Sequence, residues 1–162
     1  MGGARHDSRG RLLLRPRMLA AAVATAAAST VALLPAQAQA AGSVHLYRVY
    51  YDSPGSDTRS NSSLNGEWVQ IKNSTSSSVQ LKGYTVRDAT GYKFTFPSYR
   101  ISAGKTVKVH TGKGTQSAGH VYWGRGSYVW NNDRDTVTLR TASGAFRDSC
   151  SYNSTRYDSK MC

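Results

Sequence analysis

Apolar and polar residues alternate with a period of two along five short segments of this chain, and this alternation constrains its fold most. The apolar members are Val69 and Ile71, Tyr84 and Val86, Phe94 and Phe96, Val107 and Val109, and Val137 and Leu139. Successive side chains of a strand point to opposite faces, so this pattern indicates antiparallel sheets with one face in water. Gly, Asn, Asp and Ser separate the segments and turn the chain. We therefore predict an all-β fold, an antiparallel β-sandwich of about seven to nine strands.

The first forty residues have a different composition from the rest. Five Arg precede residue 18, an apolar run covers residues 18–34, and small residues at A-x-A spacing lead up to Ala40. This order is typical of a secretory signal peptide, so we predict residues 1–40 as the signal, with cleavage between Ala40 and Ala41. A retained membrane anchor is the alternative, because the run is 17 residues long, but its Ala-rich composition favours the signal. We expect a secreted, extracellular protein with no transmembrane segment after cleavage.

Residues 41–162 have the length of one domain and are basic. Five Arg and one Asp are lost with the signal, which leaves 16 basic and 8 acidic side chains, a net charge of +8 with neutral His. Basic residues interleaved with aromatic ones suit a nonspecific polyanion or a cell-surface glycan. The candidate ligand surface comprises Lys93, Lys108, Tyr122, Trp123, Tyr128 and Trp130. We favour the alternative that Lys and Arg protect exposed sheet surface while the aromatic residues fill the core, because bulk charge does not define a site.

Cys150 and Cys162 are the only two cysteines. Both would be exported to an oxidising compartment, so we predict a disulfide between them that ties down a polar tail, residues 151–161. No Cys-x-x-Cys is present, which disfavours a catalytic thiol.

Glu67 lies in the same strand phase as Val69 and Ile71, so its side chain should point toward the core or its rim. A buried carboxylate needs a partner, and we favour an ion pair or backbone N–H groups of a neighbouring loop. The alternative groups Glu67 with Asp52 or Asp57 as oxygen ligands of calcium.

Other residues give little support for catalysis. Asp133 and Asp135 do not continue into a calcium-loop pattern and are typical of a turn. His45, His110 and His120 have no zinc spacing and no adjacent nucleophile motif, so we interpret them as surface or rim residues. We predict no enzymatic activity and no cofactor. An extracellular metal-dependent hydrolase that uses Asp and Glu ligands is the alternative.

Five short motifs occur in order along the chain, at residues 67–73, 81–88, 94–97, 103–104 and 130–139. They resemble the lamin-tail domain, and the similarity covers nearly all of residues 41–162. Tyr84 stands where this family usually has Trp, Ala103 where Pro is common, and Arg134 where Gly is common. The resemblance implies an immunoglobulin-like β-sandwich. We expect a stand-alone, secreted bacterial member that acts as a monomeric, non-catalytic binding or structural module of unknown ligand.

Overall fold

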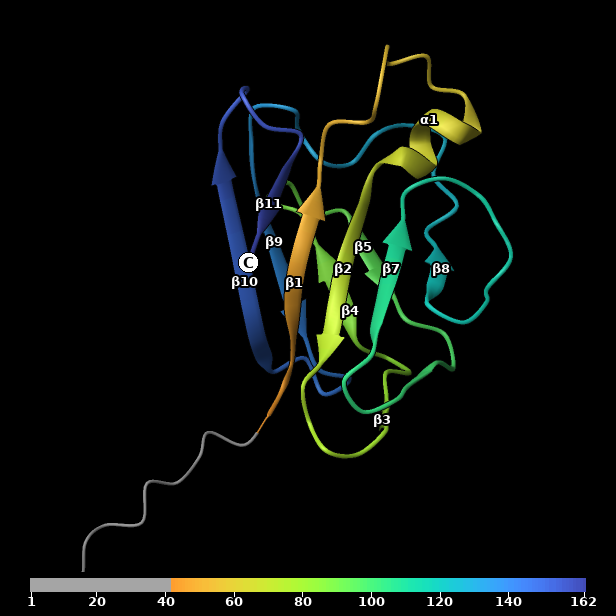
Figure 1. Cartoon of the computed structure of the whole chain (residues 1–162), viewed down its shortest axis with the longest axis vertical. Helices are drawn as coiled ribbons and strands as arrows, with labels where there is room; N and C mark the ends of the chain where they lie inside the picture. Colours follow the sequence, from red (N-terminus) through yellow and green to blue (C-terminus); the bar gives the residue numbers. More distant parts are fainter. Residues whose placement is uncertain (1–41) are drawn as a thin grey trace, which may run out of the picture. The chain divides into compact units, whose positions relative to one another are not determined.

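Strands with one apolar face build two packed sheets (Figure 1) in the computed structural model, which describes residues 42–162. The first sheet has the order β11-β1-β2-β7-β8 and comprises β1 (Val44–Tyr50), β2 (Trp68–Asn73), β7 (Thr106–His110), β8 (His120–Tyr122) and β11 (Ser159–Met161). The second has the order β10-β9-β4-β5 and comprises β4 (Thr85–Arg87), β5 (Lys93–Thr95), β9 (Arg134–Arg140) and β10 (Phe146–Asn153). Two short strands, β3 (Val79–Gln80) and β6 (Arg100–Ile101), form a separate pair. The predicted all-β sandwich is confirmed.

The apolar layer between the sheets is the one that the alternation predicted. Nine of the ten apolar residues named from the alternation are at most 6% exposed, and Tyr84 is half-buried; the nine are Val69, Ile71, Val86, Phe94, Phe96, Val107, Val109, Val137 and Leu139. The rings of Phe94 and Phe96 meet edge to face, with centroids 5.0 Å apart. Trp130 also lies in this core at 2% exposure, so its place in the predicted ligand surface was wrong.

Two elements depart from the predicted antiparallel pattern. Strand β8 pairs with β7 in parallel, whereas the alternation predicted only antiparallel pairing. A parallel neighbour needs a crossover connection, and the segment between His110 and His120 supplies it.

The second departure is a six-residue helix, α1 (Asn61–Gly66), which the predicted all-β fold does not include. The Ser60 side chain accepts a hydrogen bond from the Ser63 N–H and caps the helix, which explains why so polar a segment is helical. Within residues 42–162, no helix is long and apolar enough to cross a membrane. The predicted signal peptide and its cleavage site between Ala40 and Ala41 lie outside the described residues.

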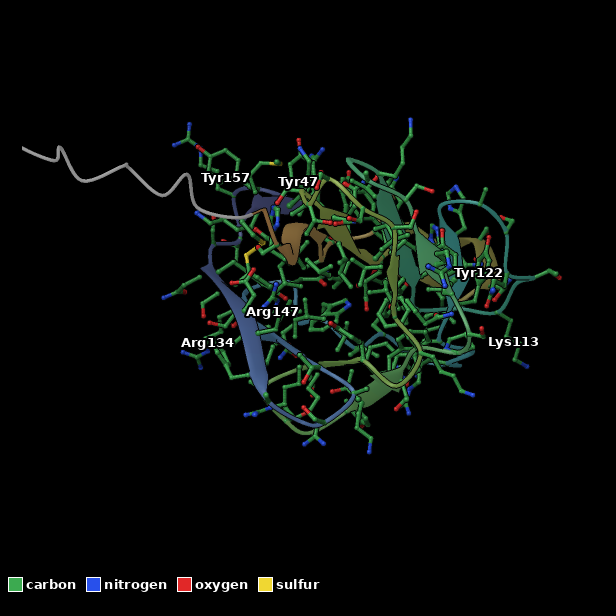
Figure 2. All side chains as sticks on the ribbon, turned by 90° about the horizontal axis from the view of Figure 1, so that it is seen from below. Tyr47, Lys113, Tyr122, Arg134, Arg147 and Tyr157 are labelled. Carbon is green, nitrogen blue, oxygen red and sulfur yellow. A yellow bond between two sulfur atoms is a disulfide. The ribbon has the colours of Figure 1, made fainter. Side chains whose placement is uncertain are left out.

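The disulfide between Cys150 and Cys162 is present and connects the two sheets, since Cys150 belongs to β10 and Cys162 follows β11. It is the yellow bond in Figure 2. The expected polar tail is therefore structured: residues 151–153 complete β10 beside β9, and β11 pairs with β1. At the same edge the Leu46 N–H donates to Asp148 Oδ2 at 2.8 Å, which also bridges the sheets.

Candidate functional site

A row of aromatic side chains crosses the outer side of the five-stranded sheet. Strand register places Tyr50 opposite Trp68, Trp68 opposite His110, and His110 opposite Tyr122. All four are half-buried and alternate with buried residues such as Val69 and Val109. The rings contact in pairs, with centroids 5.3 Å apart for Tyr50 and Trp68 and 5.0 Å apart for His110 and Tyr122. We call Tyr50, Trp68, His110 and Tyr122 the aromatic row.

Basic side chains lie directly beside this row. Arg48 on β1, Gln70 on β2 and Lys108 on β7 are register partners, and Lys72 is two residues farther along β2. The Lys108 Nζ is 4.0 Å from the centroid of the Trp68 ring, and the Arg48 guanidinium carbon is 5.9 Å from it on the β1 side. We call Arg48, Lys72 and Lys108, with Trp68 between them, the cationic face.

Lys72 and Arg48 are each anchored by a neighbour. The Lys72 Nζ lies 5.0 Å from the centroid of the Tyr47 ring. The Arg48 Nη2 donates to Ser159 Oγ at 2.7 Å. Such contacts restrict long side chains that would otherwise be mobile, so the three cations are held at defined positions on the sheet.

No carboxylate forms an ion pair with the cationic face in the described part of the chain. The one ion pair found in residues 42–162 joins Arg134 to Asp133, and both side chains are largely exposed. The acidic side chains Glu67, Asp88 and Asp135 are buried, and Asp148 accepts from a backbone N–H at the sheet edge. The positive charges of the cationic face are therefore not neutralised by a protein carboxylate.

Edge protection does not account for these cations. Lysine commonly blunts a sheet edge by discouraging another strand from pairing there. Strands β1, β2 and β7, however, are paired on both sides. Arg48, Lys72 and Lys108 thus sit on the middle of the sheet, where no unpaired backbone needs protection.

A surface hollow of about 610 Å³ continues from the cationic face at Thr106. Thr106 Oγ1 accepts a hydrogen bond from the Gln70 side chain at 3.0 Å, which joins the hollow to β2. Arg100 and Lys105 line it together with Ser, Gly and Gln residues of the neighbouring loops, and none of its lining residues is acidic. The hollow thus extends the positive surface beyond the sheet.

His110 and His120 form a hydrogen-bonded pair that sequence reasoning missed. His110 Nδ1 lies 2.9 Å from the Asn65 carbonyl oxygen and must donate to it, so the Nε2 of a neutral His110 accepts from His120 Nδ1, also at 2.9 Å. Burial lowers the pKa of His110, and the nearby charges of His120 and Lys108 lower it further. The hydrogen bond to Asn65 raises this pKa but does not outweigh burial. In the described residues no serine hydroxyl or carboxylate hydrogen-bonds to an imidazole, so the pair has no catalytic-triad geometry.

Glu67 is buried, as the strand phase predicted, and its partners are mainly backbone groups. Its Oε1 accepts from the N–H groups of Val129 and Trp130 at 2.9 and 3.0 Å and from Thr111 Oγ1 at 2.7 Å. This confirms the expectation that a neighbouring loop supplies the hydrogen bonds. Burial outweighs these bonds and raises the pKa of Glu67 to about 7.

The proposed grouping of Glu67 with Asp52 and Asp57 around calcium is not formed. Asp52 and Asp57 each accept from Asn132 Nδ2, at 3.0 and 3.2 Å, while Glu67 faces the interior. Within residues 42–162 no three His, Cys, Asp or Glu side chains gather in an arrangement that holds a metal ion. Asp52, Asp57 and Glu67 are close in the sequence, but the fold does not bring their carboxylates together.

The predicted ligand surface is divided by the fold. Lys93 lies on β5 of the second sheet and Lys108 on β7 of the first, so the two point away from opposite sides of the sandwich. Trp123 packs against Phe94 with centroids 5.8 Å apart, and the Tyr128 hydroxyl is bonded to Ser63. Lys108 belongs to the cationic face and Tyr122 to the adjoining aromatic row. Figure 2 shows Tyr47 and Tyr122 on the side of the five-stranded sheet and Arg147 on the side of β10.

Comparison with known families gives one match: the family model described as Lamin Tail Domain matches residues 37–154. These residues include both sheets except β11, so Cys162 and the closure of the disulfide lie beyond the matched segment. A search of curated proteins finds no match.

Proposed function

The chain belongs to the lamin tail domain family, and on that premise we propose that it is an exported, non-catalytic module that binds an anionic polymer through the cationic face. Domains of this immunoglobulin-like family are consistent with binding or structural roles. Because a fold does not by itself define a ligand, the surface chemistry must indicate what this domain binds.

The signal-like sequence and the disulfide support export. Residues 1–40 have the basic, apolar and small-residue order of a secretory signal. A disulfide between Cys150 and Cys162 is typical of a protein that works in an oxidising compartment. We propose that it works in the extracellular space of a bacterium; the alanine-rich leader supports only the bacterial source.

The observation that carries the proposal is the set of unneutralised cations on central strands. The cationic face holds three cations: Arg48 and Lys108 are register partners of Gln70, and Lys72 lies two residues from Gln70. Aromatic contacts hold them in place, and the positive surface continues at Arg100 and Lys105. Fixed positive charges without carboxylate partners attract polyanions and lose little conformational entropy when they bind. Binding of this kind requires no bond to be broken, in agreement with a non-catalytic module.

Mapping of the bound surface tests the proposal. Dextran sulfate, added to the exported protein with its disulfide intact, should shift the backbone amide NMR signals of β1, β2 and β7. The outer side of β4 and β5, which carries Arg87 and Lys93, serves as the internal control because it is also basic. Shifts confined to β4 and β5, or no shift at all at low salt, would contradict the proposal.

A further inference from the structure

We propose that the ligand of the cationic face is an acidic polysaccharide, recognised through its charged groups and not through stacking on aromatic rings. This inference rests on the proposed function and adds the chemical class of the ligand. It depends on how the aromatic side chains of the five-stranded sheet are used within the protein.

Both sides of the Trp68 ring face protein groups. Strand β2 lies between β1 and β7, and each neighbour sends a group toward the indole. Tyr50 packs on it from β1, with an angle of 27° between the ring planes. Lys108 approaches from β7, with its Nζ 4.0 Å from the ring centroid. Neither face of Trp68 is therefore open to a stacked base or sugar.

Other aromatic side chains of this sheet also contact a neighbouring ring or cation. His110 stacks on Tyr122 and also on His120, in both cases with 19° between the planes. The Lys72 ammonium group lies near the face of Tyr47. Proteins that bind single-stranded nucleic acids use free aromatic faces for successive bases, whereas each of these rings already contacts a neighbouring ring or cation. The unneutralised charges of the cations are therefore the feature that this face offers to a ligand.

The positions of the cations suit a linear chain with repeated negative charges. Arg48 and Lys108 are two strands apart, about 10 Å, and Lys72 is displaced by one repeat of the strand, about 7 Å. The hollow with Arg100 and Lys105 continues this path past Thr106. A polysaccharide with carboxylate or sulfate groups can follow such a path without placing an apolar base in water. We therefore infer an acidic polysaccharide as the occupant.

A nucleic acid without bases keeps its phosphate charges but cannot stack, so it separates recognition of charge from stacking on aromatic rings. Oligo(dT) and an abasic oligomer with the same number of phosphates are compared with polygalacturonate and uncharged dextran by titration at constant salt. We expect equal dissociation constants, within about twofold, for oligo(dT) and its abasic counterpart, since stacking of even one base would tighten binding by about fivefold or more. Polygalacturonate should bind at least as tightly per charge, and uncharged dextran should not bind.

The possible failures are distinguishable. If the bases tighten binding by fivefold or more, the face is a nucleic-acid interface; the ligand class proposed here is then wrong, while the proposed binding function stands. If uncharged dextran binds as well as polygalacturonate, recognition is not through charge and the inference is overturned. If neither polygalacturonate, oligo(dT) nor dextran sulfate binds, the inference and the proposed function both fail.

A gain-of-function pair provides a second test that does not depend on loss of a side chain. Gln70 lies between Arg48 and Lys108 on the register line, so Gln70→Lys adds a charge at the centre of the face. Thr95→Lys adds the same charge on the exposed side of β5. We expect Gln70→Lys to bind polygalacturonate at least threefold more tightly and Thr95→Lys to bind like the wild type. Equal gains by both variants would overturn the inference, because net charge alone would then explain the affinity.

Discussion

Glu67 accepts the backbone N–H of Trp130 through Oε1 at 3.0 Å, so a carboxylate with no exposed surface joins the start of β2 to the loop before β9. The same oxygen accepts from Val129 and Thr111, whereas Oε2 has no hydrogen-bond partner within the described residues. Burial opposes ionisation more strongly than these bonds favour it. The pKa of Glu67 is therefore raised from 4.5 to about 7.

This relationship predicts a pH-dependent stability. Because the folded state holds the Glu67 proton more tightly than the unfolded chain does, the contribution of Glu67 to stability should be fully present below pH 4.5 and be lost as the pH rises to about 7. The loss should be on the order of 3 kcal/mol. Urea unfolding of wild type and Glu67→Gln across this pH range measures the loss: the free energy of unfolding should fall more steeply with pH in the wild type. Parallel pH profiles for the two proteins would show that Glu67 is not the group responsible.

The disulfide should contribute to stability mainly by restricting the unfolded chain. Replacement of both cysteines, Cys150→Ser with Cys162→Ser, should lower the free energy of unfolding by roughly 3 kcal/mol in the chain-entropy model and leave the β-sheet circular dichroism unchanged. The wild-type protein secreted into the medium should have a mass lower by two hydrogens than its reduced form. Two free thiols in that material would contradict the assignment.

The core should respond to truncation far more than the outer side of the same segment. Phe96 is 2% exposed, so Phe96→Ala should cost about 3 to 5 kcal/mol. Lys93 on β5 is exposed, and Lys93→Ala should change stability by less than about 0.5 kcal/mol. Thermal melting of the two variants gives the comparison, and similar melting temperatures would be incompatible with the assigned inward and outward positions.

Export should remove the signal-like segment. Amino-terminal sequencing of the protein from the culture medium should begin at Ala41, because small residues precede the expected cleavage site. Ala40→Phe should block cleavage and retain the chain at the membrane. A wild-type protein that keeps its leader and stays in the membrane fraction would instead support the anchor interpretation.

The sheets could be predicted because strand alternation is a local property. Val69 and Ile71, or Val137 and Leu139, lie two residues apart and reveal their buried face without any knowledge of neighbouring strands. Helix α1 and β8 were missed because both are short, and β8 depends on a parallel partner in β7. Local signals of this length are too weak to define an element.

The candidate site could be predicted only in part, because it depends on register between strands. Alternation does place Lys72 and Lys108 on outward positions. A bulge in β1 between Leu46 and Arg48 shifts the phase of that strand, which hid Arg48 as a member of the same face. Trp130 was misplaced because its Asn- and Asp-rich surroundings are typical of a surface turn, whereas its indole packs into the core.

The salt dependence of binding tests the central claim most directly. Dissociation constants for dextran sulfate are measured over a range of salt concentrations for wild type, for Lys72→Gln with Lys108→Gln, and for Lys82→Gln with Lys93→Gln, a control pair of equal charge change at exposed positions elsewhere. Each lost contact should reduce the slope of log affinity against log salt by somewhat less than about one unit. We expect the first pair to lose at least tenfold in affinity and between one and two units of slope, and the control pair to match the wild type. Equal losses in both pairs would show that net charge, and not the cationic face, binds the polymer.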